Sequence, residues 1–202
     1  MLPAATVQTI NPCWQVVTTP VLTQGERVDA VILHAVVAAL LLSGPAHAQE
    51  WINYEDRAWG FSINFPHEPK MERIDYKTYF GQTVPARVYS AEQGSGRYSL
   101  TVVYFAGVPT DSHTAVSYAA EAIRDKGKVT YYAFDSLDGI PGQMISTIQP
   151  DGRLIQAGVY FVDQRLYIAE GSVAAGSAAP AQFHQSIRIV DPDGNPIILE
   201  PN

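Results

Sequence analysis

Hydrophobic and polar positions alternate in short runs between residues 60 and 105, the period of two that predicts β-strands. The segment FSINF at 61–65 has an apolar side chain at every second position. Two further runs, Met71–Tyr79 and Val84–Ala91, flank Phe80-Gly81-Gln82 and predict a hairpin. In Tyr98–Phe105 both alternating sets are rich in apolar residues. We therefore predict that this run is a central strand covered on both faces.

A different period follows in the middle of the chain. Apolar residues recur three and four positions apart, which predicts a helix, at Val116, Ala119, Ala120 and Ile123. Asp111 or Ser112 can cap its start because a short polar side chain accepts hydrogen bonds from the first free backbone amides. Arg124, Lys126 and Gly127 are typical of a helix end.

Strand patterns return after this helix. They cover four runs: Val129–Phe134, Met144–Gln149, Leu154–Val162 and Arg165–Glu170. The last three are separated by turn sequences, Pro150-Asp151-Gly152 and Asp163-Gln164, so we expect an antiparallel meander.

A short helix is predicted at about Ala178–Ser186, with Ser177 as its cap and Phe183 and Ile187 as a docking pair four residues apart. A turn at 191–196 and the apolar run 197–199 end the chain. The order of strands, helix, strands, helix predicts an α+β fold, with a mostly antiparallel sheet and helices packed on it.

The first 48 residues are interpreted as a signal peptide. Ala30–Leu42 is apolar except for one histidine, is shorter than the roughly 20 residues of a membrane span, and precedes Ala46-His47-Ala48, a signal-peptidase pattern. Cleavage after Ala48 leaves one domain, 49–202, periplasmic or secreted and with no stable membrane anchor. The leader before the apolar run is over-long, which a downstream start at Val28 would explain. A buried helix or an uncleaved anchor is the alternative.

Composition disfavours one class of partner and excludes one kind of chemistry. The 202 residues carry a net charge of −7 without a cluster of Lys or Arg, which disfavours nucleic acid as a partner. Cleavage after Ala48 would change the net charge to −6 and remove the single cysteine, Cys13. A domain without cysteine has neither disulfides nor thiol chemistry, so its stability comes from packing.

The sequence resembles small exported PsbP-like proteins in its opening GFSINFP (Gly60–Pro66), its long hairpins, its mid-chain helix and its closing FHQSIRI from Phe183. The resemblance implies an α/β/α sandwich around an antiparallel sheet, in a family composed mostly of non-enzymatic binding or assembly-assisting proteins. It carries over no functional residue, because these motifs are packing motifs.

The segments that come nearest to familiar catalytic and cofactor motifs are interpreted as ordinary turns or isolated residues. Gly94-Ser95-Gly96 joins two strands, so it is neither a nucleophile elbow nor a dinucleotide loop. His67, His113 and His184 are dispersed in three different elements, and no pair has the spacing of metal ligands on one helix. We expect His113 at a helix start and His184 as an exposed neighbour of Phe183. The sequence predicts no metal site and no cofactor.

The acidic residues do not indicate a calcium site or a catalytic pair. The segment from Asp191 to Pro196 begins like a calcium loop, but Pro196 stands where that loop needs glycine, so we interpret the segment as a turn. The carboxylate pairs Glu68/Glu72 and Asp135/Asp138 are interpreted as solvated edge charges, not as an acid/base pair.

Aromatic side chains are the remaining candidates for a binding site. Trp51, Tyr54 and Trp59 lie close together in the sequence, and Tyr79 lies in the predicted hairpin. Large amphipathic rings are common in binding surfaces and equally common on sheet faces, so packing is the competing interpretation. If these residues form a binding site, Arg73, Lys77 and Arg87 are its expected polar companions.

Together these patterns favour a non-catalytic binding or accessory module whose partner is a protein or a small molecule. Two alternatives stay open. One is a hydrolase whose scattered catalytic residues no motif reveals, and the other is a subunit of an envelope complex.

Overall fold

The computed structural model describes residues 51–105 and 107–200. The predicted signal peptide, 1–48, lies outside the described residues. Among the described residues, neither helix has the length and apolar run needed to cross a bilayer.

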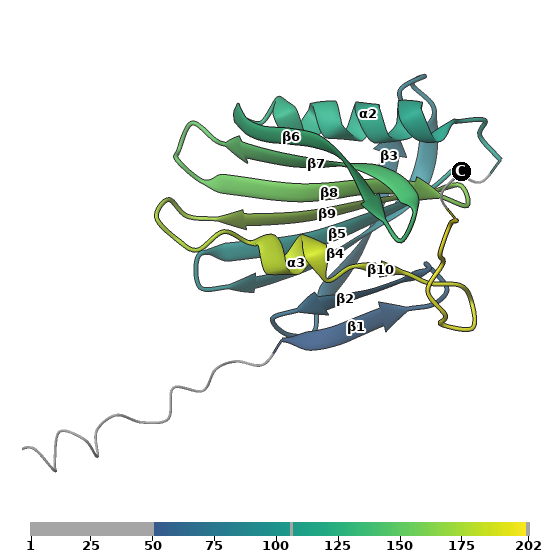
Figure 1. Ribbon diagram of the computed structural model, residues 1–202, viewed down its shortest axis with the longest axis horizontal. Helices are drawn as coiled ribbons and strands as arrows, with labels where there is room; N and C mark the ends of the chain where they lie inside the picture. Colours follow the sequence, from purple (N-terminus) through teal and green to yellow (C-terminus); the bar gives the residue numbers. More distant parts are fainter. Residues whose placement is uncertain (1–50, 106, 201–202) are drawn as a thin grey trace, which may run out of the picture. The chain divides into compact units, whose positions relative to one another are not determined.

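A seven-stranded sheet dominates the described part of the chain (Figure 1). Its neighbouring strands are antiparallel throughout. Their order across the sheet is β3 (Lys70–Lys77), β4 (Thr83–Gln93), β5 (Gly96–Tyr104), β9 (Arg165–Val173), β8 (Leu154–Val162), β7 (Ile140–Ile148) and β6 (Lys128–Leu137). The predicted hairpin and the predicted meander are both confirmed in it.

The central position of β5 is also confirmed. Leu100 and Val102 are buried on one face of the sheet, and Val103 is buried on the other. Strands β4 and β9 flank β5, so both of its edges are paired as well. The high apolar content of this run therefore reports burial on two faces at once.

Helix α2 (Ser112–Arg124) packs on one face of this sheet, over β7, β8 and β9 (Figure 1). Asp111 caps it, because one of its carboxylate oxygens accepts a hydrogen bond of 2.8 Å from the Thr114 amide. The apolar positions predicted from the helical period, together with Ala115, are its buried residues. They form a core with the strand residues Val103, Ile145, Ile155, Ala157 and Leu166.

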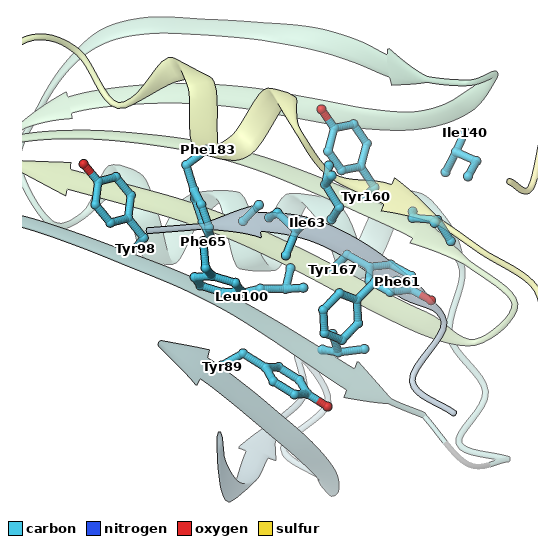
Figure 2. Close-up of a cluster of buried hydrophobic side chains, with 14 of the residues drawn as sticks. Phe61, Ile63, Phe65, Tyr89, Tyr98, Leu100, Ile140, Tyr160, Tyr167 and Phe183 are labelled. Atoms are coloured by element: carbon cyan, nitrogen blue, oxygen red, sulfur yellow. The ribbon is translucent and has the colours of Figure 1, made fainter. Parts of the chain in front are cut away.

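A second core fills the opposite face of the sheet. There a small sheet in the order β1 (Ile52–Asp56), β2 (Phe61–Phe65) and β10 (Arg188–Ile189) joins helix α3 (Ala181–Gln185) in covering it. Figure 2 shows large rings from both sides in this core, with Phe65 of β2 beside Phe183 of α3, ring centroids 5.1 Å apart. The α+β fold class, with helices packed on a mostly antiparallel sheet, is therefore confirmed.

Three details differ from the sequence predictions. Strand β1 was not predicted, and β6 and β7 extend to a turn at Asp138-Gly139, where both residues have positive φ (52° and 83°). The late helix is shorter than predicted, and its N-cap is Pro180, without a side-chain hydrogen bond, instead of Ser177. The predicted docking pair within and after that helix, Phe183 and Ile187, is fully buried.

Candidate functional site

A large hollow lies beyond the C-terminal end of α2, on the face of the sheet that carries this helix. Its volume is about 900 Å³. We call it the helix-side groove. The residues that define it below are Lys70, Ser90, Glu92, Arg97, Ser99, Lys126, Arg153, Glu170 and Ser172.

The groove forms because the helix-side residues of β9 and β5 change from apolar to polar along each strand. On the helix side of β9, Leu166 and Ile168 are apolar, and Glu170 and Ser172 follow. The neighbouring β5 runs antiparallel and changes from Val103 to Ser99 and Arg97 at the same end of the sheet. Helix α2 covers the apolar ends. The polar ends therefore remain open and line the groove.

Charged side chains in the groove are held by specific partners. Lys126 Nζ lies 2.6 Å from a carboxylate oxygen of Glu170, and Arg97 Nε lies 3.2 Å from one of Glu92. The first pair joins the segment after α2 to β9, and the second links the two strands of the β4–β5 hairpin. Both ion pairs are partly solvated, so we expect each to contribute little to stability.

Arg153 is fixed differently, by neutral groups. Its Nε donates to Ser172 Oγ at 3.1 Å, and its Nη2 donates to the carbonyl oxygens of Ser172 and Ser95 at 3.0 and 2.9 Å. These bonds tie the turn after β7 to β9 and to the β4–β5 turn. No carboxylate within the described segments forms an ion pair with this half-buried guanidinium. Its charge therefore remains available to a ligand.

The four aromatic residues predicted as binding residues do not form one site. Trp51 packs edge-on against Tyr98, with ring centroids 4.8 Å apart, as part of the second core. Tyr54 packs against the core ring of Tyr89 at 5.7 Å. Tyr79 lies elsewhere, in the β3–β4 turn, and is 63% exposed. These placements are compatible with packing roles for Trp51 and Tyr54.

Trp59 does meet two of its expected companions. With Arg73 and Arg87 it lines a separate hollow of about 480 Å³ beside the β3–β4 edge of the sheet. The Arg87 guanidinium carbon lies 4.4 Å from the centroid of the Trp59 ring, a cation–π geometry. Lys77 does not line this hollow.

Asp56 organises this cluster from the end of β1. One carboxylate oxygen accepts the Trp59 amide at 3.1 Å. The other accepts the Tyr89 hydroxyl at 2.6 Å and Arg87 Nη1 at 3.2 Å. Burial, together with the bond to Asp56, raises the pKa of Tyr89 well above its ordinary value. Trp59 is therefore held both by Asp56, through its amide, and by Arg87, through its ring.

Two predictions about polar residues are wrong. His184 is buried, with 1% of its surface exposed, because the short helix α3 turns it towards the sheet. Neither of its ring nitrogens has a hydrogen-bond partner in the described structure, and desolvation lowers its pKa. Asp135 is not a solvated edge charge, because it is half-buried and accepts the Tyr160 hydroxyl at 2.6 Å.

Two predicted positions, His113 at a helix start and the turn that begins at Asp191, are confirmed. His113 lies in the first turn of α2 and is exposed. The segment from Asp191 forms a turn in which its carboxylate accepts the amides of Asp193 and Asn195, each at 2.9 Å. Within residues 51–105 and 107–200, no three His, Cys, Asp or Glu side chains are grouped so that they could hold a metal ion.

The groove residues were missed by the sequence analysis. They come from β3, β4, β5, β9 and two turns, so no linear spacing connects them. One usable signal was the change from apolar to polar residues along the helix-side positions of β5 and β9.

Comparison with known proteins gives a fold-level likeness only. No protein-family model matches the chain, and no curated protein matches it. Among solved structures, the chain is similar to the solution structure of cyanobacterial PsbP (CyanoP) from Synechocystis sp. PCC 6803, with 14% identity and a TM-score of 0.46. The match covers 72% of this chain and 96% of that one. The resemblance is weak and concerns the fold.

Proposed function

We propose that this protein is a non-catalytic binding or accessory module of the periplasm or cell envelope, which binds a small polar ligand in the helix-side groove. The observation that carries the proposal is the groove itself. Its volume of about 900 Å³ falls within the range of small-molecule sites, roughly 300–1,000 Å³.

The lining supports a polar ligand over an apolar one. Serine hydroxyls at Ser90 and Ser99 can donate and accept hydrogen bonds. Arg153, fixed by neutral acceptors, provides an oriented charge beside them. A ligand with hydroxyl and anionic groups would satisfy both kinds of partner, with little rearrangement of the protein.

Export rests on the sequence. The apolar segment 30–42 followed by Ala46-His47-Ala48 supports a signal peptide, and the absence of cysteine after residue 48 is compatible with a domain held by packing alone. The hydrolase alternative would require a titratable group free to act in the groove. Glu92 and Glu170 are instead engaged in ion pairs there. Asp151, which also lines the groove, accepts the Arg153 amide, and both ring nitrogens of His67 lie within hydrogen-bond distance of backbone carbonyl oxygens. These contacts support the binding role.

A structural observation also favours the alternative of an envelope-complex subunit. Strand β6 is an edge strand of the seven-stranded sheet, and its aromatic residues are exposed by 52% at Tyr131, 43% at Tyr132 and 81% at Phe134. Tyr132 and Phe134 lie two positions apart and emerge on the same face of the sheet, whereas Tyr131 emerges on the other. Exposed aromatic side chains that share a face are typical of interaction surfaces. Loss of a co-purifying partner in Phe134→Ser, with unchanged binding in the groove, would support this second function.

Native mass spectrometry of the protein isolated from cells that express it tests the binding function. We expect a bound small molecule, and we expect Ser99→Trp to lose it because an indole at this position fills the groove. Ala122→Trp, on the exposed side of α2, is the matched control and should keep the molecule. A protein without a bound molecule, or equal retention by the two variants, would contradict the proposal.

A further inference from the structure

Two arginines face each other at the hollow beside Trp59. Arg73 of β3 and Arg87 of β4 are register partners in the antiparallel ladder, so both side chains emerge on the same face of the sheet. Like charges in directly opposite positions destabilise a sheet. Asp56 compensates Arg87, but no ion pair within the described residues involves Arg73. Arg73 is therefore available for a ligand's negative charge, although Asp75 lines the same hollow.

Arg87 is oriented before any ligand arrives. Its guanidinium is stacked on the Trp59 ring, and Asp56 holds one of its nitrogens. Within the described structure, its hydrogen bonds all leave from Nη1, to Asp56 and to the Tyr89 hydroxyl. The edge formed by Nε and Nη2, which can donate two parallel bonds to a carboxylate, is not used by these contacts.

The turn that carries Trp59 is anchored as well. The Trp59 and Gly60 amides bond to the Asp56 carbonyl oxygen at 3.1 and 2.8 Å. The Tyr167 hydroxyl donates to the Trp59 carbonyl oxygen at 3.4 Å. An aromatic ring held in this way loses little conformational freedom on binding, which favours affinity.

The rest of the lining limits the ligand. Pro85 adds apolar surface, because it lies two positions before Arg87 in β4 and emerges on the same face of the sheet. Asp75 lines the same hollow and repels a ligand with several negative charges. The volume of about 480 Å³ lies within the range of small-molecule sites.

We propose that this hollow is a second binding site, specific for a monocarboxylate attached to an apolar ring. The carboxylate binds between Arg73 and Arg87, and the ring lies against Trp59 and Pro85. This site is separate from the helix-side groove, since the two share only the β3–β4 strands and no lining residue defined above.

Phenylacetate is a suitable probe, with phenylacetamide as a control that has the same ring and no charge. The readout is the tryptophan indole N–H signal in nitrogen-15 NMR spectra of the full chain, where Trp59→Phe assigns the Trp59 signal. We expect phenylacetate to shift this signal saturably, with Kd on the order of 1 mM, and phenylacetamide to bind at least about tenfold more weakly.

Variants separate the anion site from general ring binding. Arg73→Gln should weaken phenylacetate binding by about tenfold. Lys77→Gln removes a charge from the same strand but outside the hollow, and should leave the Kd unchanged. The proposal is overturned if the Trp59 signal does not move at about 20 mM phenylacetate, if the amide binds equally well, or if Arg73→Gln has no larger effect than Lys77→Gln.

Discussion

The Tyr89 hydroxyl donates a hydrogen bond of 2.6 Å to a carboxylate oxygen of Asp56, which connects β4 of the large sheet to the end of β1. Tyr89 is fully buried, so its hydroxyl depends on this bond, and the same carboxylate holds Arg87 and the Trp59 amide. One acidic residue therefore fastens the small sheet to the large one and shapes the Trp59 hollow.

Removal of the Tyr89 hydroxyl should destabilise the folded protein. We predict that Tyr89→Phe lowers the free energy of unfolding by about 1–2 kcal/mol, since a bond to a charged group is lost. Urea denaturation measures the change as a lower midpoint at an unchanged slope. Tyr131→Phe is the control, because Tyr131 is 52% exposed on β6. Equal stability of the two variants would show that the Asp56 bond contributes nothing.

The buried histidine predicts a pH dependence. Burial lowers the pKa of His184 below 6.5, and the opposing effect of Asp135 is smaller. The unfolded chain therefore binds this proton more readily, so stability is complete above pH 6.5 and decreases as the pH falls below it. Urea denaturation between about pH 5 and 8 should show this decrease, and His184→Leu should reduce it. Parallel curves for the two proteins would exclude this role of His184.

Alkaline pH should also lower the stability of the protein. Burial is the main cause that raises the pKa of six tyrosines, Tyr54, Tyr76, Tyr89, Tyr98, Tyr160 and Tyr167, above 10.0. For Tyr76 and Tyr167 the pKa is raised to about 12. Their contribution to stability is present below pH 10 and is lost as the pH rises above it.

Tyrosinate absorbance checks this prediction. The folded protein should titrate over a wider range and to higher pH than the same protein in urea, where all tyrosines are solvated. Identical titration curves in the two conditions would be incompatible with the buried positions of these rings.

Two glycines with the same backbone conformation should respond differently to substitution. Gly139 and Gly81 both have positive φ, 83° and 77°, so alanine costs about 1 kcal/mol at either position. A Cβ at Gly139 would also collide with the Leu199 carbonyl oxygen, whereas nothing lies near Gly81. We predict that Gly139→Ala is less stable than Gly81→Ala by about 1–3 kcal/mol, measured by urea denaturation. A difference below about 0.5 kcal/mol would contradict this packing.

Local patterns predicted most strands and α2, because each had a clear period and a recognisable turn or cap. Strand β1 was missed because its five residues, INYED, contain only two apolar positions and end in two acidic residues, too short a run to show a period. It is a strand because β2 pairs with it, from Ile52 opposite Phe65 to Asp56 opposite Phe61. Tertiary pairing of this kind leaves little trace in the sequence.

The sites were less predictable than the fold. Arg73 and Arg87 could be named as companions of Trp59, but the helix-side groove joins Lys126, Arg153 and other residues from distant segments. The wrong expectation for His184 has a related cause. A helix of five residues is too short for its period to show which side faces the core.

Site-specific photocrosslinking in cells that express the protein tests the binding role of the helix-side groove most directly. A photoreactive amino acid replaces Ser99 in the groove or, as the matched control, Ala122 on the exposed side of α2. We predict one reproducible adduct at position 99, identified by mass spectrometry and absent at position 122. No adduct at position 99, or the same adducts at both positions, would contradict a binding function for this groove.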